Sequence, residues 1–196
     1  MIMGKSVNAF LAKAGSLIVE LKERADVSPF IVSELNALFP KVKEAMAKIK
    51  ELETNIESIA KTLKHYDLFQ SALGVGPITA ATMLVLLCNP EVFKNGREFA
   101  AYIGLAPKSS GSGGKNFVTH IPKKCECNND VRALLVQCAH SICRCKHKSD
   151  WVSSILARKP KKVAIIAIAN KLARQLWIMA KKGEKFERRF ILAAAQ

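Results

Sequence analysis

The residues best suited to act on a polyanion form a run of serines, glycines and a lysine at positions 109–115 (Ser-Ser-Gly-Ser-Gly-Gly-Lys). This composition is typical of a flexible linker. Lys108, Lys123 and Lys124 flank the run, and a glycine-rich loop between lysines also suits a segment that wraps a phosphodiester, because glycine lets the backbone approach a ligand closely. The residues by themselves leave both interpretations open.

The six cysteines raise the question of a metal site. Cys125 and Cys127 form one C-x-C pair, and Cys143 and Cys145 form a second. Zinc sites usually separate paired cysteines by two to four residues, and a single intervening residue strains a tetrahedral chelate. No secretory leader is recognisable, so a disulfide framework is not expected either. We predict no metal site and buried or incidental thiols, with Cys138 and Cys145 on the apolar side of a helix; zinc is the alternative.

The positive charge is concentrated in the second half of the chain. Of 196 residues, 31 are Lys or Arg and 16 are Asp or Glu, for a net charge of +15. Residues 1–100 contribute +1 and residues 101–196 contribute +14. Such a surplus repels itself unless a polyanion neutralises it, so we predict a nucleic-acid partner in preference to an acidic membrane. The longest apolar stretch, Val163 to Ala169, is too short to cross a bilayer, and we expect a soluble, cytoplasmic protein.

Apolar residues in the first third repeat with heptad spacing, which predicts a long helix. Ser28 and Pro29 suit its start, and Pro40 predicts a kink or a restart inside it. Residues 7–21 repeat the pattern in an earlier helix. We expect a mainly α protein with a helical coiled-coil arm over 1–66 and a compact helical domain over 67–196. The arm either dimerises, which we favour and which would make a homo-oligomer, or folds into an intramolecular hairpin. The heptad positions are Ile31, Leu35, Leu38, Val42, Ala45, Ile49, Leu52, Ile56, Ile59, Leu63 and Tyr66.

A Gly-Val-Gly turn at residues 74–76 separates two apolar helical segments, and we interpret residues 68–88 as a helix–hairpin–helix. Gly74 and Gly76 permit a tight turn, and the helix that begins at Pro77 presents free N–H groups. Such a turn grips a DNA phosphate without reading base sequence. An ordinary helical turn is the alternative.

Three further helices are predicted at residues 93–102, 130–144 and 160–181. The last has a buried stripe of Ile165, Ile168, Leu172, Leu176 and Met179. Lys171 and Arg174 share the neighbouring face, either as DNA contacts or as solvated charges. Trp151 and Trp177 are expected in the core. A short extended piece is predicted at residues 117–121.

Read together and in order, these segments resemble the C-terminal domain of the insertion sequence 110/116/902 family of bacterial transposases, relatives of the Piv-type DNA invertases. The resemblance covers about residues 69–181, and the heptad arm resembles the coiled coil that precedes this domain in the family. The matching motifs are Leu73-Gly-Val-Gly-Pro-Ile-Thr-Ala80, Phe93-Lys-Asn-Gly-Arg-Glu-Phe-Ala-Ala-Tyr-Ile-Gly-Leu-Ala-Pro107, Ser112-Gly-Gly-Lys115, Ile121-Pro-Lys123, Arg132-Ala-Leu-Leu135 and Ala169-Asn-Lys-Leu-Ala-Arg174.

The resemblance implies DNA strand cleavage and transfer by a serine in the Ser-Gly loop, which we assign to Ser112, with Ser110 as the second choice. It also implies that Mg²⁺ is held by an Asp/Glu tetrad in an RNase-H-like domain, which we expect to be absent from this chain, and that guide RNA is a further candidate partner. The predicted DNA contacts lie in these motifs and beside the loop: Gly74, Gly76, Thr79, Arg97, Lys108, Lys115, Lys123, Lys124, Arg132, Lys171 and Arg174.

The sequence departs from the family at one point after the serine loop. Pro122 stands where the family's Ile-Ser-Lys motif has serine, and the connection that follows lacks the family's glycine. We therefore expect either a DNA recombinase that needs a catalytic partner domain, or a DNA-binding remnant that regulates full-length relatives.

Overall fold

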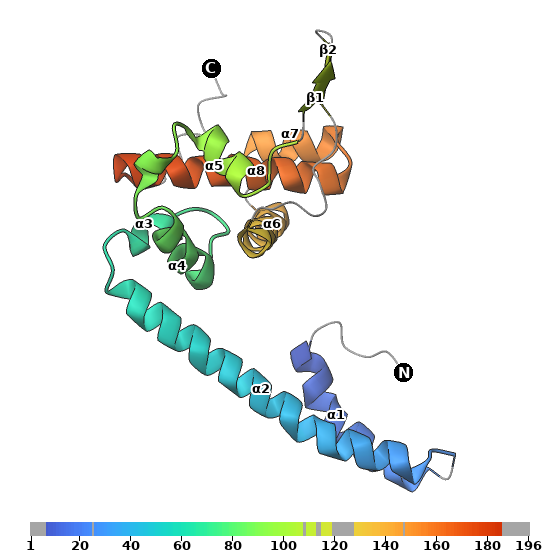
Figure 1. Cartoon of the computed structure of the whole chain (residues 1–196). Coiled ribbons are helices and arrows are strands. Elements are labelled where there is room, and N and C mark those ends of the chain that lie inside the picture. Colours follow the sequence, from blue (N-terminus) through green and yellow to red (C-terminus); the bar gives the residue numbers. More distant parts are fainter. Residues whose placement is uncertain are drawn as a thin grey trace. The chain divides into compact units, whose positions relative to one another are not determined.

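The computed structural model describes residues 7–24, 26–107, 109–112, 115–118, 128–146 and 148–185. Within these ranges the chain is mainly α-helical, which confirms the predicted class (Figure 1). The chain divides into two compact units, Met1–Asn55 and Ile56–Gln196. In chain order the elements are α1 (Val7–Glu23), α2 (Pro29–Lys61), α3 (Tyr66–Gln70), α4 (Pro77–Leu86), the short 3-10 helix η1 (Pro90–Val92), α5 (Gly96–Tyr102), β1 (Ser109–Ser112), β2 (Lys115–Val118), α6 (Asn129–Arg144), α7 (Asp150–Arg158) and α8 (Lys161–Lys182).

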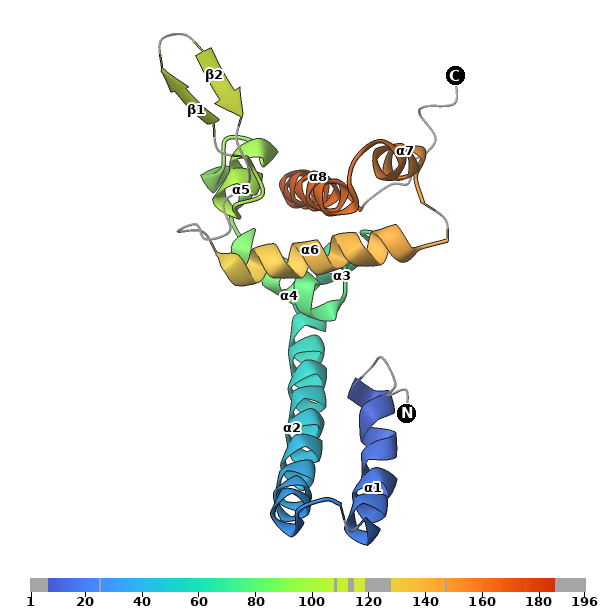
Figure 2. The same ribbon diagram turned by 90° about the vertical axis from the view of Figure 1, so that its right-hand side faces the viewer.

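In the first unit, α1 folds back beside the first half of α2 (Figure 2). Ala14 and Ile18 of α1 and Val32 of α2 are buried where the two helices meet. An apolar hollow of about 320 Å³ remains between them, lined by residues such as Leu17 and Phe39. The intramolecular hairpin is therefore present in this region of the chain.

The heptad positions of α2 remain largely exposed despite this hairpin. Ile49 is 50% exposed, Leu52 is 49% exposed and Ile59 is 65% exposed. The helix runs without interruption from Pro29 to Lys61 with Pro40 inside it, so the predicted restart does not occur. Pro29 is its first residue, as expected of proline at a helix start.

In the second unit α8 is the central helix. It contacts α6 and α5 most extensively, and α3, α7 and η1 also contact it (Figure 2). The five residues predicted for this stripe are all buried, and Trp177 is buried with them. The indole Nε1 of Trp177 donates a hydrogen bond to the carbonyl oxygen of Pro90 at 3.0 Å, which satisfies its one polar atom.

Among the described helices, α8 alone has a length and mean hydropathy that would suit a membrane span. Half of its most apolar window is buried inside the unit. A central core helix must be apolar on most sides because it is covered by neighbours on most sides. Its place beneath α5, α6 and α7 therefore accounts for its composition.

The turn between α3 and α4 is built against α6. Gly74 has a φ of +81°, a conformation that L side chains rarely adopt. A Cβ atom there would lie 2.7 Å from a side-chain carbon of Ile142 and 2.9 Å from the carbonyl oxygen of Cys138, both on α6. The predicted tight turn is therefore present, and the element that approaches it closely is α6.

Substitution of Gly74 should destabilise the second unit more than substitution of Gly76 or Gly183. We expect Gly74→Ala to lower the free energy of unfolding by about 1–3 kcal/mol, because it combines backbone strain with a clash. Gly183, with a φ of +69° and open space where a Cβ would lie, should cost about 1 kcal/mol when replaced by alanine. Gly76→Ala, with neither problem, is the matched control.

Denaturant unfolding of the three variants followed by circular dichroism measures these differences. Equal midpoints for Gly74→Ala and Gly76→Ala would show that the turn does not pack on α6.

Candidate nucleic-acid interface

The Ser-Gly segment forms one strand of an antiparallel hairpin. β1 pairs with β2 in the register Ser109 to Val118 and Ser112 to Lys115. Ser112 is therefore the last residue of its strand, and the predicted cation Lys115 is its cross-strand partner. Two-residue connections such as Gly-Gly are favoured in β-hairpins. That signal at residues 113–114, followed by Phe117 and Val118, could have predicted the hairpin from sequence.

The segment before the hairpin is anchored to α8. Leu105 is almost fully buried, and its carbonyl oxygen accepts a hydrogen bond from Asn170 Nδ2 at 3.1 Å. Leu105 lies four residues before Ser109, where β1 begins. A side chain of the central helix, which sequence reasoning did not single out, thus holds the segment that precedes the hairpin.

The two basic residues predicted on α8 are both partly buried. Lys171 Nζ lies 4.0 Å from the centre of the Trp151 ring, in a cation–π contact between α8 and α7. Burial and, less strongly, the neighbouring Arg174 lower the pKa of the Lys171 ammonium from its ordinary value. Arg174 Nε is buried and has no hydrogen-bond partner. Trp151, predicted in the core, is half-buried, whereas Trp177 is buried, and each ring has a lysine ammonium over it.

The other predicted basic contacts lie at the first turns of two helices. Arg97 is exposed at the start of α5, where the Asn95 side chain accepts hydrogen bonds from the backbone N–H groups of Arg97 and Glu98. Arg132 is half-buried at the start of α6, and its guanidinium donates to Asn129 Oδ1 at 2.8 Å. Arg97 is thus open to a ligand, whereas Arg132 is partly engaged within its own helix.

Two residues of the Gly-Val-Gly region pack against α6. Thr79 is 5% exposed, and its Oγ1 lies 3.5 Å from Cys138 Sγ of α6. The structure thus places the Thr79 side chain in the core, and its predicted DNA contact stays a prediction. The conformation of Gly74 is required for its fit against α6, so DNA is not needed to explain it. Gly76, the N-cap of α4, has open space beside it and stays a predicted contact.

Several of the predicted residues lie partly or wholly outside the described part of the chain. Lys108, Lys123 and Lys124 lie outside the residues that the structure describes. For Ser110, Ser112 and Lys115 only the backbone is described. Their predicted roles stay predictions.

The cysteines that the structure describes do not assemble with other ligands. Cys138 is 5% exposed, as predicted for a thiol on the apolar side of α6, whereas Cys145 is half-buried at the end of that helix. Cys125 and Cys127 lie outside the described residues. Among the described residues, no group of three or more His, Cys, Asp or Glu side chains is placed to hold a metal ion.

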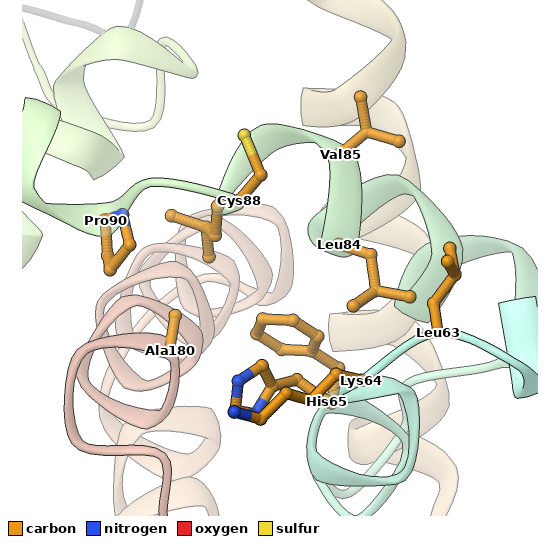
Figure 3. Close-up of a pocket in the computed structure, with 10 residues that line it drawn as sticks. Leu63, Lys64, His65, Leu84, Val85, Cys88, Pro90 and Ala180 are labelled. Atoms are coloured by element: carbon orange, nitrogen blue, oxygen red, sulfur yellow. The ribbon is translucent and has the colours of Figure 1, made fainter.

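A hollow of about 440 Å³ opens beside α3, α4 and the end of α8 (Figure 3). Its polar lining side chains are Lys64, His65 and Cys88, among apolar groups such as Leu84 and Ala180. No carboxylate lines it, and it includes none of the residues predicted to contact DNA. This hollow is therefore separate from the residues predicted to contact DNA.

The chain from the end of α6 to the start of α8 is rich in cations. Between residues 144 and 162 it has seven Lys or Arg and a single carboxylate, Asp150. Burial raises the pKa of the Cys143 thiol, and the charges of Lys148 and Lys161 oppose that rise.

Comparison with known proteins supplies the family. Residues 66–152 match the family described as Transposase IS116/IS110/IS902. The chain is 32% identical over 185 residues, 89% of its length, to a putative transposase of Sinorhizobium fredii. It is 31% identical over 150 residues, 74% of its length, to a probable family 20 transposase of Pseudomonas aeruginosa. The chain belongs to the IS116/IS110/IS902 transposase family.

A third relative is the transposase for insertion sequence element IS1328 of Yersinia enterocolitica, which is 28% identical over 87% of the chain. The matched regions make up 47%, 44% and 52% of these three relatives, so the chain spans about half their length. The family match covers α3 to the start of α7, which includes the hairpin and all of α6.

The thiols of this transposase-family chain should differ sharply in reactivity. Burial raises the pKa of the Cys138 thiol, although hydrogen bonds from Thr79 and from the Gly76 backbone oppose the rise. Cys88 is exposed. At pH 8 we expect iodoacetamide to alkylate Cys88 at least about tenfold faster than Cys138, because the thiolate is the reactive form.

Peptide mass spectrometry over a time course measures both rates. Denaturant should abolish the difference. Equal rates in the folded protein would mean that α6 does not cover the start of α4.

Proposed function

We propose that this chain binds DNA and cleaves one strand through Ser112, as the C-terminal part of an insertion-sequence transposase, with Ser110 as the second choice of nucleophile. The observation that carries the proposal is the hairpin register, which pairs Ser112 with Lys115 at the end of a strand whose approach is anchored on α8. The family resemblance assigns the nucleophile to this segment. A hairpin supported by a core helix holds a reactive residue more precisely than a free linker does.

The proposed step is a transesterification. The Ser112 hydroxyl gives its proton to a base and forms a bond from Oγ to phosphorus, while the bond from phosphorus to the sugar oxygen breaks. The released sugar oxygen takes up a proton, so the strand is cut and its phosphate remains joined to the serine. A lysine ammonium at the register position of Lys115 would stabilise negative charge on the pentacoordinate transition state.

The Mg²⁺ that the family resemblance implies does not fit the residues described here. Magnesium prefers carboxylate oxygens, and within the described ranges no three acidic, His or Cys side chains gather at one place. We therefore route no step through a metal held by this chain and assign activation of the serine to the partner domain that the resemblance implies.

The DNA backbone is proposed to lie along the basic residues of the second unit. Exposed Arg97, half-buried Arg132, Lys171 and Arg174, and the lysines beside the hairpin are the proposed contacts. Gly76 at the start of α4 is a further candidate for a backbone N–H contact to phosphate. Because such contacts read phosphate and not base sequence, guide RNA remains an additional candidate partner.

We further propose that α2 associates with a second copy of the chain as a coiled coil. Its heptad positions expose a continuous apolar stripe, with Ile49, Leu52 and Ile56 each at least 41% exposed. Apolar residues at this spacing form the seam between two supercoiled helices. A single described copy leaves that seam in contact with water, which is unfavourable.

A non-catalytic DNA-binding regulator is the second candidate function. The observation that favours it is that the described residues bring together no acidic cluster for two-metal chemistry. The two functions share DNA binding and differ only in the covalent step.

A covalent-adduct assay separates them. The chain, mixed with a catalytic domain from a full-length relative, Mg²⁺ and labelled DNA, should form a protein–DNA adduct that survives denaturing electrophoresis. Ser112→Ala should lower the adduct yield at least about 100-fold and leave DNA affinity within about twofold, because only the nucleophile is lost. Ser109→Ala is the matched control.

Loss of the adduct in Ser110→Ala, but not in Ser112→Ala, would move the nucleophile to Ser110. Absence of any adduct from the unaltered chain would favour the regulator.

The coiled-coil association is tested by sedimentation equilibrium at micromolar concentrations. We expect the unaltered chain to sediment as a dimer and Leu52→Asp to sediment as a monomer, because a buried carboxylate in the seam lacks a partner. Ala47→Asp, exposed on α2 but off the heptad stripe, adds the same charge and should remain dimeric. A monomeric unaltered chain, or a dimeric Leu52→Asp, would contradict the proposal.

A further inference from the structure

Two neighbouring cations on α8 have no anionic partner among the described residues. Lys171 and Arg174 lie one helical turn apart, and each is partly buried. Across the described residues the ion pairs join other side chains, such as Lys181 with Glu91 on the same side of α8. Lys171 and Arg174 take part in none of them. Two like charges held close together in a partly desolvated place are unfavourable without a counter-ion.

The Arg174 guanidinium also has a buried N–H donor without a hydrogen-bond acceptor among the described residues. A guanidinium has five N–H donors, and buried donors are nearly always hydrogen-bonded. Arg174 Nε is buried without a partner. The start of α5 is seated directly on this turn, since a Cβ at Gly96 would lie 3.2 Å from both the Cα and the carbonyl oxygen of Arg174. Close seating of α5 accounts for the burial of Nε, but it supplies no acceptor.

The place of the pair in the fold relates it to the hairpin. Asn170, the residue before Lys171, holds the carbonyl oxygen of Leu105 at the base of the hairpin. Trp151 of α7 holds the Lys171 ammonium from the other flank at 4.0 Å. The two cations thus lie next to Asn170, through which α8 binds the segment that leads into β1. They are fixed by packing on both sides and are not free surface charges.

We propose that Lys171 and Arg174 together form one subsite for a backbone phosphate group of the nucleic-acid strand on which the Ser112 hairpin acts. This inference rests on the proposed function. A phosphodiester provides the negative charge that the pair lacks, and charge-assisted hydrogen bonds from an ammonium and a guanidinium to phosphate oxygens are strong. The subsite positions the strand, while the hairpin performs the chemistry. It reads no base sequence, because it contacts only the backbone.

The first test compares single substitutions by fluorescence anisotropy with a labelled DNA duplex and with an RNA of the same sequence. We expect Lys171→Ala and Arg174→Ala each to weaken binding about fivefold to tenfold and to reduce the slope of log affinity against log salt by about 1. Arg174→Lys keeps the charge and loses the planar fork, so it should weaken binding about threefold. Lys182→Ala, an exposed cation at the end of the same helix, is the matched control and should change affinity less than about twofold.

The second test needs no substitution at the site. NMR of ¹³C-methylated lysines follows the titration of Lys171 in the free protein and in the complex with the oligonucleotide. Burial and Arg174 lower its pKa in the free chain, and a bound phosphate favours the charged form, so the pKa should rise by at least about one unit in the complex. A purely structural role for Lys171 would leave its pKa unchanged.

The outcomes separate this inference from the proposed function. If the unaltered chain binds DNA but the two alanine variants match Lys182→Ala and the pKa of Lys171 does not move, the subsite is wrong and the proposed function stands. If the unaltered chain binds neither DNA nor RNA, both fail. A response with one nucleic acid alone identifies which strand occupies the subsite.

Discussion

The second unit depends on the burial of one helix. α8 has an apolar stripe that must be removed from water, and α6 crosses it while α5 packs beside it (Figure 2). Burial of this kind contributes roughly 25 cal/mol for each Å² of apolar surface, so the five large side chains of the stripe contribute substantially to the stability of the core. α3, α5, α6, α7 and η1 all contact this helix. The segment that leads to the hairpin is no exception, since Asn170 holds it in place.

α8 also makes polar contacts to the chain on either side of α5, at the start of η1 and just after α5. Trp177 donates to the carbonyl oxygen of Pro90, and Asn170 donates to that of Leu105, two turns away. These bonds satisfy backbone groups in a segment that contains little regular structure, as buried carbonyls require. Lys171 and Arg174 lie on the same turns without such partners. Polar side chains along one helix thus differ in whether they find a hydrogen-bond partner among the described residues.

The turn at Gly74 was predicted correctly from the sequence, but the element that packs against it was not. The pattern Gly-Val-Gly before Pro77 correctly predicted a tight turn between helices, because only glycine readily adopts the positive φ found at Gly74. It did not reveal what lies against the turn. The side chain of Ile142 and the backbone of Cys138, more than sixty residues later in the chain, fill that space. Thr79 is a further case. A threonine hydroxyl suits a phosphate contact, but here the side chain is buried beside the Cys138 thiol of α6.

The sequence by itself determined the helices, the buried stripe of α8, the family and the cationic second half. These depend on periodicity, composition and short motifs, which are local properties of the chain. Tertiary structure alone decided that α6 packs against Gly74, that Asn170 anchors the segment before the hairpin, and that Lys171 and Arg174 are partly buried without a counter-ion among the described residues. Each of these involves residues brought together from distant positions, and burial and satisfaction of a polar group are properties of its surroundings and not of its own type.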